Sequence, residues 1–302
     1  MLVVGVAHAR ILHVGDNTIK LSQTKTTTPA LHVRVGDEIW YGMMYPFKSV
    51  NTLHVNYNDV SYSVLQCEPF TDMINYIYDD TDRLVGTNEN IYLESTGTQW
   101  IDTLYIPTLI TRTEMEIKFS DDEYKTSGFE GFFGVEDKKN KTSYSMNFGK
   151  GTGQAYQIFV WPCLLYNPAW CYVRNLNINR TLKTTKQLVV LDAKNNIAKY
   201  GTISTELQGR GVIGVGGVVL FGMRSIDVKG TESISVYSRN NSMYIYSTKI
   251  YEDDVLVRHF VPVPCGLKIG GFVVPENGMW DIVEQKFYGN MGTGEFIYGV
   301  DE

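Results

Sequence analysis

The chain has 302 residues, enough for one large β domain or two domains with a buried core, so its size alone requires neither disulfides nor metals. Its 20 Tyr, 13 Phe and 28 Gly, with few long helical patterns, indicate an all-β protein, because aromatic residues favour pleated half-buried surfaces and Gly marks bulges and turns. A net charge of −6 without a Lys/Arg cluster argues against a nucleic-acid binder, whose affinity comes mainly from neutralised phosphates.

Membrane association and metal binding are not expected. The first ten residues lack the basic start and long apolar run of a signal peptide, and no later stretch reaches membrane-spanning length. Cys67, Cys163, Cys171 and Cys265 have neither the density of a disulfide scaffold nor the spacing of a zinc site, so we expect free thiols. A bond between Cys163 and Cys171 across a turn is the alternative.

A weak repeat predicts hairpins in residues 1–66. Leu-His-Val stands before a Gly/Asn/Asp turn at residues 12–14, 31–33 and 53–55, and an alternating run follows each turn. Such hairpins form a small β domain that needs a neighbour to hide its surface. We expect its partner-facing residues to include His13, His32, Trp40 and His54. Three imidazoles could hold zinc or iron, but no acidic residues stand at a fixed spacing to orient them, so solvated strand faces are expected instead.

The best helix pattern follows at residues 70–78. Phe70, Met73, Ile74, Ile77 and Tyr78 recur at helical spacing, which predicts about three turns. A polar stretch then runs to Asn90 and predicts a domain boundary near residue 85, which gives domains 1–85 and 86–302.

The rest of the chain predicts short antiparallel strands separated by Gly, Asn and Asp turns, which must close as a sandwich or barrel. The expected strands are Thr113–Phe119, Phe129–Val135, Ser143–Phe148, Tyr156–Trp161, Leu188–Leu191 and Val218–Phe221. A hairpin follows, with alternating runs at 243–251 and 255–260 around an acidic turn. Strict alternation would place Tyr244, Tyr246, Thr248 and Ile250 on one face of the first strand.

Two segments of this second domain resemble a known family. They are Tyr-Leu-Glu-Ser-Thr-Gly-Thr-Gln-Trp-Ile-Asp-Thr at 92–103, and the hairpin at 249–262 with Trp-Asp-Ile-Val-Glu-Gln-Lys-Phe-Tyr-Gly-Asn-Met-Gly-Thr-Gly-Glu-Phe at 280–296. They are similar to the concanavalin A-like (laminin G-like) jelly-roll domains of tailed-phage virion proteins and of gut-bacterial surface proteins. The resemblance covers about residues 90–300, although its middle offers only compatible strands. Trp100 and Trp280 replace an expected Tyr, and Gln285 replaces an expected turn Gly.

The resemblance implies a two-sheet jelly-roll sandwich whose first and last segments pair, with Gln99–Thr103 near Ile250 or Phe287. It also implies a non-enzymatic virion structural protein, either a head decoration (auxiliary capsid) protein or a fibre-type protein, made in the host cytoplasm. The first domain would attach to the particle, and the partners would be major capsid, fibre or tail subunits, or further copies of the chain. The alternatives are a carbohydrate-binding surface adhesin of a gut bacterium and, with less support, a glycoside hydrolase.

The sequence predicts no catalytic site and no cofactor. Related hydrolases carry Glu-x-Asp-x-x-Glu on one strand face, and this chain lacks it. The acidic groups Asp121–Glu123, Glu130 and Glu136–Asp137 fit solvated loops, without a spaced calcium ligand set. We expect Lys249, Arg258 and Asp281 to pair with polar groups at strand edges and turns of the sandwich.

Glycan binding is the functional option that residue type supports. It would use exposed aromatic faces with a few polar neighbours. The densest such cluster contains Trp161, Tyr166, Asn167, Trp170 and Tyr172. The alternative is that Trp161 and Trp170 pack between the sheets, as most large aromatic residues of a sandwich do.

Overall fold

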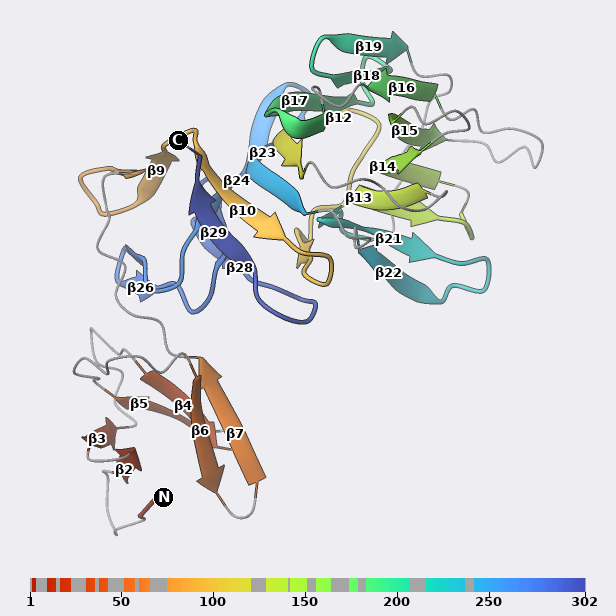
Figure 1. The fold of residues 1–302 in the computed structure, drawn as a ribbon. Helices are drawn as coiled ribbons and strands as arrows, with labels where there is room; N and C mark the ends of the chain where they lie inside the picture. Colours follow the sequence, from red (N-terminus) through yellow and green to blue (C-terminus); the bar gives the residue numbers. More distant parts are fainter. Residues whose placement is uncertain are drawn as a thin grey trace. The chain divides into compact units, whose positions relative to one another are not determined.

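The structure is a computed structural model that describes residues 2–3, 10–14, 17–22, 31–35, 38–42, 52–57, 60–65, 75–120, 129–140, 142–150, 156–163, 174–178, 183–206, 216–236 and 242–301. These ranges contain strands and turns with no helix longer than one turn, which confirms the all-β class. The contacts divide the chain into two units, Met1–Leu84 with Pro264–Glu276, and Val85–Val263 with Asn277–Glu302. Figure 1 shows the strands of both units.

The first unit contains the three predicted hairpins. They are β2 (Arg10–Val14) with β3 (Asn17–Ser22), β4 (Leu31–Val35) with β5 (Glu38–Gly42), and β6 (Thr52–Tyr57) with β7 (Val60–Leu65). With β1 (Leu2–Val3), the first two hairpins form a five-stranded sheet in the order β1-β2-β3-β5-β4. The third hairpin forms a sheet of its own. The repeat therefore predicted the hairpins, but not their division between two sheets.

The predicted helix at 70–78 is wrong at its C-terminal end, and Phe70, Met73 and Ile74 lie outside the described residues. Tyr76–Tyr78 form β8, which pairs with β9 (Leu84–Thr87). Tyr76 is buried while Ile77 is 59% exposed, an alternation that suits a strand and not a helix. Asp79 then closes a tight turn, since its Oδ1 accepts the N–H groups of Thr81 and Arg83 at 3.0 and 2.9 Å. The short hairpin of β25 (Lys268–Ile269) and β26 (Phe272–Val273) belongs to the same unit.

The second unit contains two large sheets, and the strands predicted for it are confirmed. The ten-stranded sheet runs β19 (Ile203–Glu206), β18 (Ile197–Tyr200), β17 (Gln187–Asp192), β12 (Thr111–Phe119), β23 (Met243–Glu252), β24 (Val255–Val263), β27 (Gly278–Asp281), β28 (Lys286–Tyr288), with β10 (Ile91–Ser95) beside β23 and β29 (Ile297–Val300). The eight-stranded sheet runs β11 (Ile101–Asp102), β20 (Val219–Leu220), β13 (Phe129–Asp137), β14 (Thr142–Lys150), β15 (Tyr156–Cys163), β16 (Arg174–Ile178), with β21 (Gly222–Ile226) beside β13 and β22 (Glu232–Val236).

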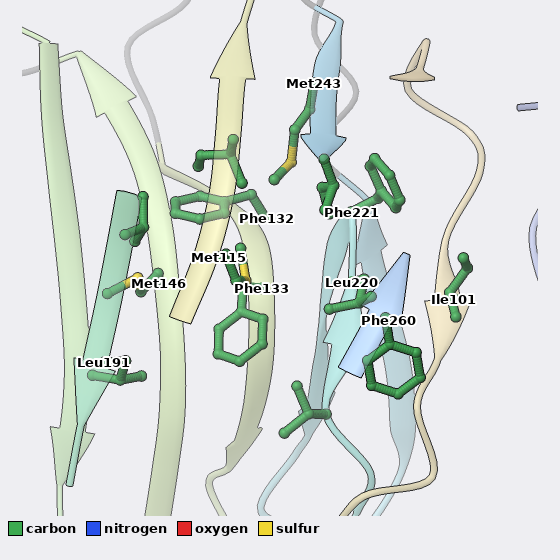
Figure 2. Packing of buried hydrophobic residues seen from close by; sticks show 14 of the residues in the cluster. Ile101, Met115, Phe132, Phe133, Met146, Leu191, Leu220, Phe221, Met243 and Phe260 are labelled. Carbon is green, nitrogen blue, oxygen red and sulfur yellow. The ribbon is translucent and has the colours of Figure 1, made fainter. Parts of the chain in front are cut away.

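The two sheets share one apolar core. In β12 every second residue is buried, so Met115, Ile117 and Phe119 point inward. The ring of Phe119 packs edge-on against Phe132 of the other sheet, with centroids 5.5 Å apart. Figure 2 shows Met115 and Leu191 beside Phe133, Met146 and Leu220, which come from the facing sheet.

One polar residue also links the sheets through this core. The Tyr144 hydroxyl, on β14, lies 2.9 Å from Thr113 Oγ1 and donates to the Leu191 carbonyl at 2.8 Å, and both partners are in the ten-stranded sheet. Complete burial raises the pKa of Tyr144, so the hydroxyl stays neutral and keeps its proton for this bond. The contact therefore fixes the sheets against each other with a satisfied buried hydroxyl.

The β23–β24 hairpin is present, but the predicted face of its first strand is wrong. Asp253 and Asp254 form the turn with φ of 49° and 64°, the left-handed pair of a type I′ turn. Opposite β12, Ile117 pairs with Ile245 and Glu116 with Ser247, which leaves Tyr246 as the extra residue of a β-bulge. Ile245, Thr248 and Ile250 are therefore buried on the core side. The bulge turns Tyr246 to the outer face beside Tyr244.

Candidate functional site

The outer face of the ten-stranded sheet carries an aromatic and charged group that we call the tyrosine–lysine cluster: Tyr92, Lys118, Tyr244, Tyr246 and Asp301. Tyr92 and Lys118 alternate with core residues on β10 and β12, so both point outward. Register places Tyr244 next to Glu94 and Lys118, and the bulge adds Tyr246. Three strands and the end of the chain thus meet at this cluster.

Lys118 lies at the centre of this cluster. Its Nζ is 4.8 Å from the ring centroid of Tyr244, and 5.7 and 5.8 Å from those of Tyr92 and Tyr246. The Asp301 carboxylate oxygens lie 2.7 and 2.9 Å from the same Nζ, and the Tyr246 hydroxyl also donates to Asp301. Although partial burial acts in the opposite direction, these two donors hold the pKa of Asp301 below its ordinary value. Burial, followed by the nearby Glu94 carboxylate, raises the pKa of Tyr244 to about 12.

The arrangement is a cation–π site occupied by the chain's own lysine. Lys186 lies 5.0 Å from the centroid of Tyr246 and donates to the Glu89 carbonyl. The cluster fastens the C-terminal Asp301 to β12, and its ring faces are not presented as an open sugar platform.

A second charged group follows along the same face at the hairpin turn. The Arg112 guanidinium lies 4.1 Å from the Tyr251 centroid and is ion-paired with Glu114. Asp254 lies 3.6 Å from Arg112 and accepts from Lys194, which also pairs with Asp253 at 2.8 Å. These charges are balanced locally by residues of their own sheet.

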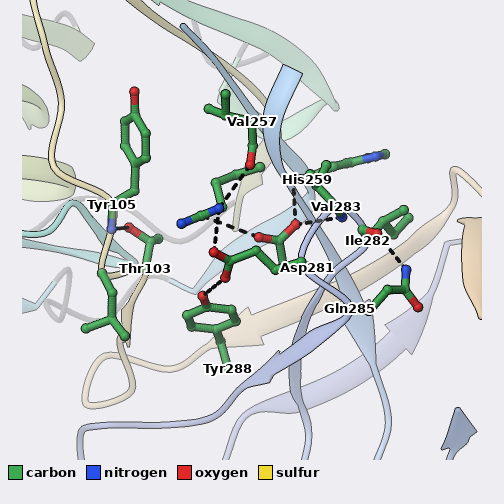
Figure 3. A network of polar contacts seen from close by, with 12 residues as sticks. Thr103, Tyr105, Val257, His259, Asp281, Ile282, Val283, Gln285 and Tyr288 are labelled. Carbon is green, nitrogen blue, oxygen red and sulfur yellow. Dashed lines mark hydrogen bonds and ion pairs between the residues drawn. The ribbon is translucent and has the colours of Figure 1, made fainter. Parts of the chain in front are cut away.

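A polar network fastens β24, β27 and β28 together (Figure 3). Asp281 is fully buried, and its Oδ1 accepts the N–H groups of His259 and Val283 at 3.0 and 2.9 Å. Arg258 Nε lies 3.5 Å from Asp281 Oδ2, and its Nη1 lies 2.6 Å from Glu284. The Tyr288 hydroxyl donates to Glu284 at 2.5 Å. Both carboxylates are therefore held by strand and turn partners, as expected for Arg258 and Asp281.

His259 belongs to the same network and faces Lys249 across the register. Burial, together with the Lys249 charge, lowers the pKa of His259 to about 4. The imidazole is therefore neutral near pH 7.

The two segments that resemble the jelly-roll family meet in space. We call residues 95–100 with 290–294 the strap. The Thr98 hydroxyl donates to the Thr293 carbonyl at 2.6 Å, and the N–H of Met291 to the Trp100 carbonyl at 2.9 Å. Asn290 Oδ1 accepts the Trp100 N–H at 3.2 Å. Since β10 also pairs with β29, the first and last segments of the unit do pair. The neighbours expected for Gln99–Thr103 are wrong, because Trp100 contacts Asn290 and Met291, whereas Ile250 pairs with Thr113 and Arg258 and Phe287 pairs with Trp280.

The predicted glycan site is not assembled within the described residues. Trp161 lies on β15, where its backbone pairs with Ser145 of β14. Tyr166, Asn167, Trp170 and Tyr172 lie outside the described residues. The glycan site stays a prediction.

The predicted partner-facing residues lie on three different hairpins. His13 is on β2, His32 on β4, Trp40 on β5 and His54 on β6. Two strands separate β2 from β4, which at about 4.8 Å per spacing puts His13 and His32 at least about 14 Å apart, and the register offsets them further along the strands from Thr18 to Ser22. His54 lies in the separate two-stranded sheet. Strand pairing in one chain therefore does not bring the three histidines together.

The expected solvated loop is wrong for Asp137, which is the last residue of β13 and is buried, and a turn motif explains its position. Asp137 accepts from the backbone and side-chain N–H groups of Asn140 at 2.9 and 2.7 Å. Asp192 makes the same two bonds to Asn195, both at 2.8 Å. The sequence signal for this motif is the repeated Asp-x-Lys-Asn between alternating runs. Asp121 and Asp122 lie outside the described residues.

Cys265 corrects the expectation of free thiols. It is disulfide-bonded, and its partner lies outside the described side chains. Spacing along the chain did not predict the bond, because a disulfide depends on the separation and orientation of two cysteines in space.

Among the described residues, no three His, Cys, Asp or Glu side chains are grouped to hold a metal ion. No helix in these ranges is long and apolar enough to cross a membrane.

Comparison with known proteins adds no relative. No family model, curated protein or solved structure matches the chain.

Proposed function

We propose that the chain is a non-enzymatic structural protein of a tailed-bacteriophage virion, of the head-decoration or fibre type. In this proposal the second unit is a concanavalin A-like jelly roll, and the hairpins of residues 1–85 attach it to capsid, fibre or tail subunits.

The strap is the observation that carries this proposal. The residues that resemble the family are those that hydrogen-bond the first strands of the unit to its last ones, through Thr98, Trp100, Asn290 and Thr293. Residues that close a fold are the ones that a shared fold would retain. The pairing therefore supports a common architecture with the virion proteins that the two segments resemble.

The polar clusters of the second unit also favour a structural role. The tyrosine–lysine cluster and the Asp281 network are both filled by side chains of the unit itself. Polar groups paired within one unit tie its strands together, although Asp281 Oδ2 and Arg258 Nε face each other at 3.5 Å without a hydrogen bond.

The proposal includes glycan adhesion by Trp161, Tyr166, Asn167, Trp170 and Tyr172. Glycan-array binding of the full chain tests it, with Trp161→Ala and Trp170→Ala as variants and Phe272→Ala, at an aromatic side chain that is 42% exposed, as the control. Binding lost in the first two variants and kept in the control is expected. Equal binding by all proteins contradicts this location.

A surface adhesin is the second candidate, and the Cys265 disulfide is compatible with it, since such bonds persist on cell surfaces as well as on virions. Quantitative mass spectrometry of purified phage particles and of host surface fractions separates the two. We expect the chain in particles at a fixed ratio to the major capsid protein. Its absence from particles overturns the virion proposal, and release of reducing sugar from a polysaccharide overturns the non-enzymatic one.

A further inference from the structure

The second unit exposes a group of aliphatic side chains on the loop between β11 and β12 and at the tip of the β23–β24 hairpin. We call it the aliphatic loop surface: Leu104, Ile106, Leu109, Ile110, Val255 and Leu256, each between 37% and 65% exposed. The two pieces are neighbours, because the Asp253 N–H donates to the Ile110 carbonyl at 3.2 Å. The Thr108 hydroxyl also donates to Glu252 at 3.1 Å.

Anchored neighbouring residues fix the backbone so that these aliphatic side chains stay exposed to solvent. Burial alternates along the loop. Thr103 and Tyr105 are buried, whereas Leu104 and Ile106 are exposed. Thr103 Oγ1 donates to the Val218 carbonyl at 2.6 Å, and the Val218 N–H donates to the Tyr105 carbonyl at 2.8 Å. A fixed backbone therefore presents the aliphatic groups, which lowers the entropy that binding would cost.

Leu104 adds a strained backbone at the centre of this loop. Its φ is 58°, in the left-handed region that is unfavourable for a bulky residue. Asp102 Oδ1 accepts the Leu104 N–H at 2.9 Å, and Arg224 in turn is ion-paired with Asp102 and with Glu232. Strain that surrounding contacts enforce is characteristic of functional positions.

The charges at the edge of the surface, which are paired within the chain, also suit a second copy of it. Lys194 lies beside Asp253 and Asp254, and the two carboxylates are 67% and 57% exposed. Opposite charges side by side are self-complementary across a twofold axis, where Lys194 of one copy can face the partner's Asp253. An anionic membrane surface would repel the consecutive acidic residues Glu252, Asp253 and Asp254, so a membrane is not the expected partner.

The size of the surface also fits this partner. Six aliphatic groups at about half exposure supply an apolar centre of a few hundred Å², within a standard interface of about 800 Å² per partner. We propose that the aliphatic loop surface is an interface between two copies of this chain. This inference does not depend on the proposed virion function.

Sedimentation velocity of the full chain over a wide concentration range tests the interface. We expect a reversible dimer. The double variant Leu104→Asn, Ile106→Glu should raise its dissociation constant by at least about a hundredfold, since two partly buried aliphatic contacts are lost. Asn suits the left-handed backbone at position 104, which protects the fold. The control Val228→Glu changes an aliphatic residue that is 71% exposed in the β21–β22 turn, and it should leave the dimer intact.

A charge exchange provides a second test that does not depend on the loop variants. Lys194→Glu and Asp253→Lys should each weaken self-association, and an equimolar mixture of the two should associate again. A wild-type chain that is monomeric throughout overturns the proposal. So does association that survives the double variant, a mixture that stays monomeric, or binding to phosphatidylserine vesicles without a dimer.

Discussion

The strap and the aliphatic loop surface are adjacent in the chain, yet they differ in how their side chains are used. In the strap, Thr98 and Asn290 satisfy backbone groups from opposite ends of the second unit. In the loop that follows, Leu104 and Ile106 point into solvent. The strap completes the fold, and the loop leaves apolar surface uncovered. The comparison separates residues whose loss unfolds the unit from residues whose loss changes only what the unit binds.

The largest expected loss of stability comes from the polar network around Asp281, which joins β24, β27 and β28. Asp281→Ala removes the acceptor of two backbone N–H groups and one partner of Arg258, at zero exposure. Because the donors remain buried, we expect a loss of about 4 kcal/mol of unfolding free energy. Urea denaturation followed by tryptophan fluorescence measures it. Asp281→Asn, which keeps the accepting oxygen, should lose much less, and equal losses would contradict this account.

Gly292→Ala tests the strap itself. A Cβ at position 292 would lie 1.9 Å from the Thr98 carbonyl oxygen, and a backbone atom cannot rotate away. We expect a loss of about 3 kcal/mol, at the upper end of overpacking effects. Gly271→Ala is the control, because a Cβ there meets nothing within 4 Å, although its φ of 83° adds some strain. A variant Gly292→Ala as stable as the wild type would show that the strap is looser than described.

Lowering the pH should destabilise the packing of β24 against β27, because His259 then takes up a proton. Its pKa falls from 6.5 in the unfolded chain to about 4 in the folded one, so the folded state binds fewer protons. The contribution is complete above pH 6.5 and is lost as the pH falls towards 4. After allowance for solvent screening we expect about 2 kcal/mol. His259→Gln should remove this pH dependence, and since His259 is the sole histidine after residue 54, an unchanged profile would contradict the assignment.

The sequence predicted the strands and hairpins because period-two alternation and turn residues are local signals. It missed the face of Thr248 and Ile250 because the bulge at Tyr246 depends on pairing with β12. It mistook Ile77 and Tyr78 for a helix, since apolar spacing over a few residues fits both periods.

Sites were harder to predict than strands. The tyrosine–lysine cluster joins residues from β10, β12, β23 and the C-terminus, and no spacing in the chain brings them together. The aliphatic loop surface was missed for a different reason. The spacing of Leu104 and Ile106 resembles that of buried strand residues, and only the anchoring of Thr103 and Tyr105 turns them outward.

The smallest expected effect compares the strained residue of the aliphatic loop surface with one in the turn between β27 and β28. Leu104 and Gln285 both have left-handed backbones, with φ of 58° and 55°, and Gln285 stands where the resembling family has Gly. Leu104→Gly should stabilise the monomer by about 1 kcal/mol, because glycine has no Cβ to strain. Gln285→Gly should gain less, since it loses the bond from Nε2 to the Ile282 carbonyl at 2.6 Å.

Thermal unfolding at concentrations below dimer formation measures both changes. A gain at Leu104 would mean that the chain retains leucine there at a cost to its own stability, as expected of a residue kept for contact with a partner. A loss would mean that Leu104 packs against its own unit, and the contrast with the strap would then disappear.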